Sequence, residues 1–198
     1  MSNDAVDLDK RRFLTTATTA VGAVGAAFVA VPFLASWMPS ERAKNAGAPV
    51  QVDISKIQDG QMLTVEWRSK PVWIVKRTAK SIEDIAKQND LVRDPNSENP
   101  DQQPEYAANE TRSRKPEILV LVGICTHLGC SPTYRPDIAP ADLGADWLGG
   151  FFCPCHSSKF DMAGRVYKSV PAPTNLEVPP HYYVSDTLIH IGDDGEAA

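Results

Sequence analysis

The sequence C-T-H-L-G-C at residues 125–130 and the sequence C-P-C-H-S-S at residues 153–158 are the most informative parts of this chain. We call them the first box and the second box. Together they contain all four cysteines, and each also holds one histidine. An apolar run precedes each box, Leu119–Ile124 before the first and Gly149–Phe152 before the second. We therefore expect both boxes to be loops at strand ends, where a rigid scaffold presents side chains for chemistry.

One cysteine and one histidine from each box could bind either zinc or an iron–sulfur cluster. Zinc prefers four ligands on one tetrahedral centre and has no use for two further cysteines. A [2Fe–2S] cluster with mixed ligands needs two thiolates on one iron and two imidazoles on the other. The pattern therefore favours the cluster, and the spare cysteines, one per box, are placed to form a disulfide. A disulfide is stable on the oxidising side of a membrane.

An apolar segment near the amino terminus predicts a membrane anchor. From Phe13 to Ser40 the sequence contains no Asp, Glu, Lys, Arg or His. Because about 20 such residues cross the hydrocarbon core of a bilayer, we expect a single transmembrane helix at residues 13–38. Trp37 suits the far membrane interface, and the basic residues within 1–12 favour a cytoplasmic amino terminus. Residues from about 41 onward would then lie across the membrane.

The run K-R-R-F-L at residues 10–14 resembles a twin-arginine export signal, although Lys10 occupies the first arginine position if Arg12 is the variable residue. Twin-arginine export carries folded cargo, which fits a cofactor inserted before translocation. The alternative is a cleavable signal peptide, with small residues near Ala35. We favour an uncleaved anchor, because the apolar span is long for a signal core.

The remainder of the chain predicts one all-β domain at residues 50–198. Residues 39–49 are polar and rich in small residues, which indicates a flexible linker or a short extended lead-in to the first strand. Runs rich in Val, Ile, Trp and Tyr indicate strands. These runs are Val50–Ile54, Met62–Trp67, Val72–Lys76, Ile118–Val122 and a hairpin of Tyr182–Val184 with Leu188–Ile191.

Other segments predict local structure and exclude one class of partner. Ser81 could cap a short helix that runs to about Asn89. Residues 91–116 and 131–150 are expected to be a surface excursion and a surface loop. The chain has 20 basic and 25 acidic residues, a net charge of −5, which argues against nucleic acid as a partner.

The two boxes together resemble those of the Rieske iron–sulfur subunit of ubiquinol–cytochrome c reductase, the cytochrome bc1 complex, of the bacterial type. The resemblance extends over almost the whole chain. It implies a Rieske-type antiparallel β-sandwich with a cluster-binding subdomain at about residues 123–175, preceded by the single transmembrane helix. It also implies one [2Fe–2S] cluster, with Cys125 and Cys153 on the buried iron and His127 and His156 on the outer iron.

The resemblance assigns further residues around the cluster. Cys130 is expected to pair with Cys155 in a disulfide. The run Pro171-Ala172-Pro173 matches the family's proline loop, which covers the cluster on a third side, and 175–179 resembles the family's next strand. Ser158 matches a serine that donates a hydrogen bond to a bridging sulfide. The sequence departs from the family at Ser157, where glycine is common, and at Phe160, where tyrosine donates to a ligand sulfur.

The same resemblance implies a function. His156 would hydrogen-bond ubiquinol in the cytochrome b subunit, and the reduced domain would carry the electron to cytochrome c1, with residues 39–49 as the hinge. This chain would act only within the complex, expected to be dimeric, in the bacterial inner membrane with its carboxy-terminal domain in the periplasm. The main alternative is the small Rieske subunit of a periplasmic molybdenum oxidase. A soluble oxygenase domain is disfavoured because such domains lack the extra cysteine pair.

Overall fold

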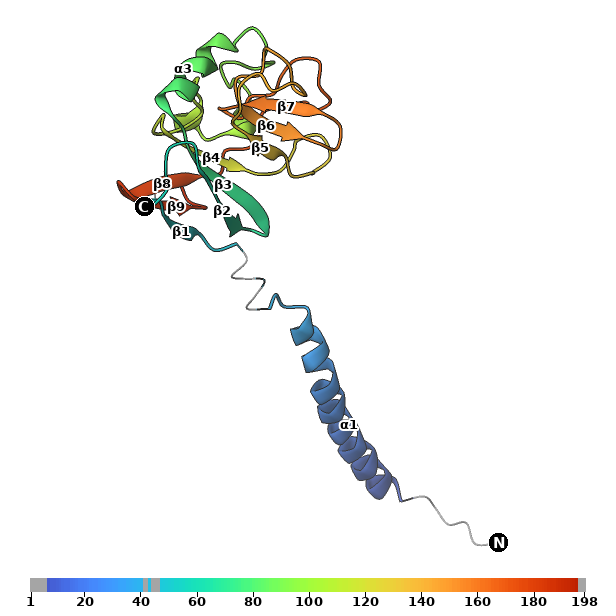
Figure 1. Ribbon diagram of the computed structural model, residues 1–198. Coiled ribbons are helices and arrows are strands. Elements are labelled where there is room, and N and C mark those ends of the chain that lie inside the picture. Colours follow the sequence, from blue (N-terminus) through green and yellow to red (C-terminus); the bar gives the residue numbers. More distant parts are fainter. Residues whose placement is uncertain (1–6, 41–42, 44–46, 196–198) are drawn as a thin grey trace. The chain divides into compact units, whose positions relative to one another are not determined.

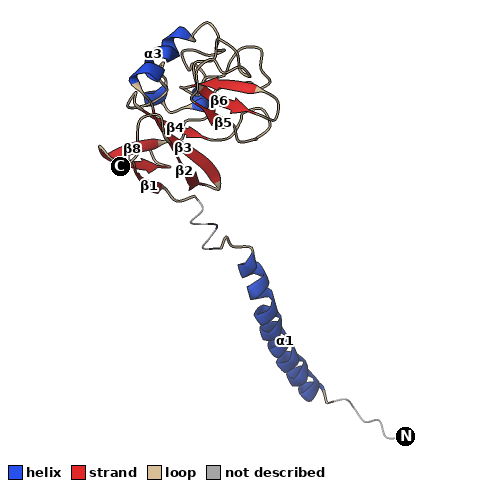
Figure 2. Cartoon of the chain, in the orientation of Figure 1, coloured by secondary structure: helices blue, strands red, loops and turns tan. Residues whose placement is uncertain are grey.

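The chain forms two compact units, Met1–Asn45 and Ala46–Ala198, in a computed structural model that describes residues 7–40, 43 and 47–195. The first unit holds helix α1 (Leu8–Ser36), and the second holds the β-domain (Figures 1 and 2). The expected linker at residues 39–49 includes 41–42 and 44–46, which lie outside the described residues, as do residues 1–6 of the expected cytoplasmic segment.

Helix α1 begins earlier than the expected span. Asp7 caps it, because its carboxylate accepts hydrogen bonds from the backbone N–H groups of Asp9 and Lys10. The helix ends at Ser36, so Trp37 and Met38, which were expected within the span, follow its end. The helix is long and apolar enough to cross a membrane by length and composition, a test that a signal sequence also passes. None of its side chains is buried by the described residues.

The β-domain contains three antiparallel sheets, each of three strands, among the described residues. Their orders are β1-β9-β8, β2-β3-β4 and β5-β6-β7. The strand bounds are β1 Val50–Asp53, β2 Met62–Trp67, β3 Lys70–Lys76, β4 Ile118–Val122, β5 Thr133–Arg135, β6 Gly150–Cys153, β7 Ser158–Asp161, β8 His181–Ser185 and β9 Leu188–Ile191. The all-β prediction is therefore confirmed, and most of the expected strands agree within two residues.

The central sheet is covered on both faces, which explains the continuous apolar runs of its strands. On β3, Val72 and Ile74 face the sheet of β1, β8 and β9, where they join one buried cluster. Trp73 and Val75 alternate to the opposite face and belong to a second buried cluster with Phe151 of β6. This second cluster connects the central sheet with the sheet that carries the second box.

The two segments expected to be surface structures are partly buried. Within residues 91–116, Arg112 is fully buried and donates hydrogen bonds to the carbonyl oxygens of Ala163 and Gln102. Within residues 131–150, β5 pairs with β6, and the ring of Trp147 is buried against Tyr167. Most residues of both segments are exposed or half-buried, as expected for surface structures, but their composition did not indicate the few side chains that are buried inside the domain.

Two local predictions also need correction. Helix α3 spans Ala79–Lys87, and its cap is Thr78, whose hydroxyl accepts a hydrogen bond from the backbone N–H of Ser81. Ser81, the expected cap, lies three residues further along, in the first turn of the helix. Residues 175–179 form no strand, since prolines interrupt the ladder before β8 begins at His181.

Candidate metal centre

The first box is a tight turn that follows strand β4. Gly123 joins the strand to the box, and a Cβ atom at this position would lie 2.3 Å from the ring of Trp73, so only glycine fits. The Cys125 N–H donates to the Cys130 carbonyl, and the Gly129 N–H donates back to the Cys125 carbonyl. Gly129 has a φ of +81°, which glycine adopts without strain. These bonds hold the two ends of the box together.

The second box is the connection of a hairpin. Cys153 ends β6 and lies opposite Ser158, which begins β7, so the four residues between them form the turn. Cys153 and Ser158 are buried, whereas Cys155 and His156 are exposed. The strand register therefore places one cysteine of the box inside the domain and the other outside.

A disulfide between Cys130 and Cys155 ties the two boxes together, as expected. The rings of His127 and His156 lie side by side next to it, with their centroids 4.6 Å apart and nearly perpendicular. His127 is half-buried and His156 is exposed. The boxes thus bring two imidazoles together near the surface of the domain.

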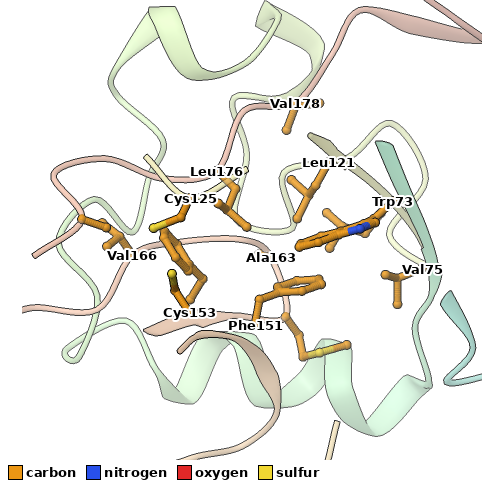
Figure 3. Close-up of a cluster of buried hydrophobic side chains, with 14 of the residues drawn as sticks. Trp73, Val75, Leu121, Cys125, Phe151, Cys153, Ala163, Val166, Leu176 and Val178 are labelled. Atoms are coloured by element: carbon orange, nitrogen blue, oxygen red, sulfur yellow. The ribbon is translucent and has the colours of Figure 1, made fainter. Parts of the chain in front are cut away.

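Two free thiols are more deeply buried than the histidines. Cys125 and Cys153 are 2% and 1% exposed, and their side chains lie close together at one end of the buried cluster (Figure 3). Burial raises the pKa of the Cys125 thiol, while hydrogen bonds from the His127 backbone and the Ser158 hydroxyl act to lower it. Two buried thiols that stay reduced, although each box also holds a cysteine of the disulfide, are suited to binding a metal as thiolates.

The donor set fits an iron–sulfur cluster better than zinc. The sulfur atoms of Cys130, Cys153 and Cys155 also lie within 4.8 Å of one another, but two of them are consumed by the disulfide and cannot serve as thiolate ligands. The remaining donors are two inner thiols and two outer imidazoles. This separation by depth matches a centre whose two irons have different ligands.

The proline loop at residues 171–173 and the residue that follows it contact the two boxes. Ala172 is fully buried, and its N–H donates a hydrogen bond of 3.1 Å to the Ser158 hydroxyl oxygen. The Thr126 hydroxyl donates a hydrogen bond of 2.7 Å to the carbonyl of Thr174. The segment therefore lies against the thiol side of the candidate centre.

Comparisons with known proteins agree with this arrangement. Residues 49–180 match the family model described as "Rieske [2Fe-2S] domain", and residues 1–40 match "Ubiquitinol-cytochrome C reductase Fe-S subunit TAT signal". The chain belongs to the Rieske family. Its cofactor is therefore one [2Fe–2S] cluster, and the expected twin-arginine signal is confirmed by the amino-terminal match.

Two bacterial relatives that match over nearly their full length share one printed name, and a mitochondrial relative has another. The chain is 57% identical to the ubiquinol-cytochrome c reductase iron-sulfur subunit of Allochromatium vinosum, a match that covers 100% of this chain and 95% of the relative. The corresponding subunit of Blastochloris viridis is 44% identical, with 96% and 97% covered. The mitochondrial Rieske subunit of the cytochrome b-c1 complex from Theropithecus gelada is 37% identical, with 91% of this chain and 58% of that protein covered.

The structure describes both residues at which the sequence is expected to depart from the family pattern. Ser157 has a φ of 61°, in the left-handed region that favours glycine. Phe160 is fully buried in the same cluster as Cys125 and Cys153. A phenyl ring offers no hydrogen-bond donor there, so sulfur atoms near Phe160 receive no hydrogen bond from it.

The sequence did not indicate the buried polar side chains that follow the second box and hydrogen-bond within the domain. Asp161 follows Phe160 and forms a fully buried ion pair with Arg165, which also donates to the carbonyl of Ile85 in α3. Asn175 accepts a hydrogen bond from the N–H of Val166. The spacing of Asp161 and Arg165, four residues apart after a strand, was the available signal, but it does not distinguish an exposed pair from a buried one.

Proposed function

We propose that this chain is the electron-transfer subunit of a ubiquinol–cytochrome c reductase. It would accept an electron and a proton from ubiquinol at the cytochrome b subunit and pass the electron to cytochrome c1. The observation that carries the proposal is the donor set, in which two buried thiols and two paired, more exposed imidazoles come from loops joined by a disulfide. Full-length similarity to subunits of that name supports the choice of complex.

In this proposal Cys125 and Cys153 ligate the inner iron, and His127 and His156 ligate the outer iron. Neutral imidazole ligands lower the negative charge of the bound cluster and so suit it to accept single electrons at a higher potential than an all-cysteine cluster. The thiol ligands lie inside the domain, where water is excluded. The disulfide holds the two boxes together. Ser158 contributes a buried hydroxyl next to the thiols.

His156 is the ligand best placed to meet the substrate, because it is exposed. Its outer ring nitrogen would accept the hydroxyl proton of ubiquinol, since an imidazole is the side chain suited to exchange protons near neutral pH. Leu128, which follows His127 in the first box, is 71% exposed and would provide an apolar contact for the cytochrome b subunit. The chain alone lacks a quinol pocket in this proposal, so it would be active only in the complex, which we expect to be dimeric.

We also propose a topology for the chain. Residues 1–12 would lie in the cytoplasm, residues 13–38 would anchor it in the bacterial inner membrane, and residues 50–198 would lie in the periplasm. The basic residues before the apolar helix support this orientation. The disulfide supports it independently, because such bonds persist in an oxidising compartment.

Purification of the native complex from membranes tests the proposal. We expect b-type and c-type haem absorption bands to accompany this chain, and the reduced protein to give the electron paramagnetic resonance signal of one mixed-ligand [2Fe–2S] cluster. Substitution of Cys125 or His127 by serine should remove that signal. Copurification with a molybdenum cofactor in place of haem would overturn the assignment to this complex.

A further inference from the structure

Residues 89–95 belong to the segment between helix α3 and strand β4. They lie beside residues 166–168, which precede the proline loop. The Arg93 N–H donates to the carbonyl of Val166, and the Lys168 N–H donates to the carbonyl of Leu91, each at 2.8 Å. Val92 and Tyr167 form an antiparallel bridge between these bonds. The two segments therefore run side by side as a short ladder immediately before the loop.

The side chain of Arg93 reaches beyond this ladder to the proline loop itself. Its two terminal nitrogens donate hydrogen bonds to the carbonyl of Pro173 at 3.2 Å and to the carbonyl of Val170 at 3.3 Å. These carbonyls flank residues 171 and 172, so one guanidinium group holds both sides of the loop. Its planar fork of donors is suited to two acceptors at once, which a lysine ammonium cannot match in geometry.

The loop that Arg93 holds is connected to the candidate centre by a short series of hydrogen bonds. Within it, the Ala172 N–H donates to the Ser158 hydroxyl oxygen. That oxygen accepts from Ala172, which leaves the Ser158 proton free to donate elsewhere, and Ser158 pairs with Cys153 in the β6–β7 ladder, where both residues are buried. The Thr126 hydroxyl holds the far end of the loop at Thr174.

We propose that Arg93 is a positioning residue for the cluster, because its guanidinium fixes the proline loop and thereby the direction of the Ser158 hydroxyl. This inference rests on the proposed cluster site. Arg93 is exposed and lies in a segment whose composition indicated only a surface excursion. In this proposal the segment influences the reduction potential of the cluster and also holds the proline loop that covers it.

Three variants of the full-length, cluster-loaded chain test the role of Arg93. They are Arg93→Ala, Arg93→Lys and, as a matched control, Arg68→Ala. Arg68 is also exposed, and its guanidinium lies over the ring of Trp67 in the β2–β3 turn. We expect Arg93→Ala to accelerate amide hydrogen exchange at Val170, Ala172 and Thr174 about tenfold, since a hydrogen bond from a charged group contributes roughly that factor.

The reduced cluster supplies the second measurement. Arg93→Ala should shift its electron paramagnetic resonance g-values and lower its reduction potential, Arg93→Lys should restore part of both, and Arg68→Ala should change neither. Unchanged exchange in Arg93→Ala would overturn the proposal. Faster exchange with an unaltered spectrum and potential would also overturn it, because Arg93 would then hold the loop without influencing the cluster. If the unsubstituted chain gave no cluster signal, the proposed function would fail instead, while the exchange measurement would still report on the loop.

Discussion

Ser157 illustrates how a single backbone angle can be tested by one substitution. The residue is exposed at the end of the second-box turn and has a φ of 61°. A non-glycine residue in this conformation incurs steric strain that glycine avoids. We expect Ser157→Gly to stabilise the domain by about 0.5–1 kcal/mol, with a rise of a few degrees in Tm. Thermal unfolding of the full chain in detergent measures this shift.

Ser131 provides the control, because it is exposed near the first box and is absent from the residues with positive φ. Ser131→Gly should lower Tm, since glycine adds only backbone freedom to the unfolded chain there. A decrease in Tm for Ser157→Gly as well would show that the side chain of Ser157 contributes more than its backbone strain costs.

Phe160 leads to a prediction about the reduction potential. Its ring is fully buried in the cluster of side chains that includes Cys125 and Cys153. A tyrosine hydroxyl there could donate to a ligand sulfur and stabilise the more negative, reduced state. We expect Phe160→Tyr to raise the potential by about 40 mV, which corresponds to about 1 kcal/mol for one electron. Redox titration followed by electron paramagnetic resonance checks the value.

Phe152→Tyr is the matched control for this substitution. Phe152 precedes Cys153 on β6, and because side chains alternate along a strand, it faces away from the thiols and packs with Trp147 and Tyr167. Its variant should leave the potential unchanged. An unaltered potential in Phe160→Tyr would mean that no sulfur accepts a bond from this position or that another donor already supplies it.

At the scale of elements, the sequence was informative where burial is regular. The apolar run Ile118–Val122 is buried at every position, and β4 has the expected bounds. The two boxes lie at the ends of β4 and β6, as the preceding apolar runs indicated. These features follow from periodicity and from where strands end, both of which are local properties of a sequence.

The elements that could not be predicted depend on contacts between distant parts of the chain. Arg112 is buried only because carbonyls of residues 163 and 164 accept its hydrogen bonds across 51 and 52 positions of sequence. Arg93 acts on the proline loop across 77 and 80 positions. Polar residues of this kind are typical of exposed loops, and nothing local to them specifies the carbonyls that they find in the fold.

The buried histidine at the start of strand β8 leads to a prediction about acid stability. His181 begins β8 and is fully buried. Its Nδ1–H donates to the carbonyl of Pro179, while Nε2 has no hydrogen-bond partner among the described residues. Burial lowers the pKa of His181 from 6.5 to about 4, with Arg114 acting in the same direction and the Pro179 bond against it.

The consequence for stability follows from the difference between the two states. Below pH 6.5 the unfolded chain binds a proton at His181 that the folded chain does not bind until the pH nears 4. The contribution of His181 to the free energy of unfolding is therefore fully present above pH 6.5. It declines as the pH falls from 6.5 to about 4, by about 3 kcal/mol in total. His181→Asn keeps a donor for Pro179 and should remove this decline, measured as the urea midpoint against pH.

The histidine on the neighbouring strand serves as the control for that experiment. His190 lies on β9 and pairs with Tyr182 next to His181. His190→Asn should retain the acid decline of the unsubstituted chain. If His181→Asn lost stability between pH 6.5 and 4 as steeply as the unsubstituted protein, the acid sensitivity would have to arise at other groups.

At the scale of the whole molecule, the proposed function requires the β-domain to meet two partners in turn. The exposed His156 would have to contact cytochrome b and then face cytochrome c1, and the anchor cannot move with it. The polar residues 39–49 between the two units are the segment that would permit this movement. Insertion of three consecutive prolines there should slow quinol-dependent cytochrome c reduction by the complex roughly tenfold, because proline-rich segments are stiff.

Insertion of three glycines at the same point separates stiffness from length. Both variants lengthen the linker equally, but glycine leaves it flexible, so only the proline variant should lose turnover. The electron paramagnetic resonance signal of the cluster should be the same in both, because no residue of the boxes is altered. Equal turnover in the two variants would argue that the electron passes from quinol to cytochrome c1 without a movement of the domain about residues 39–49.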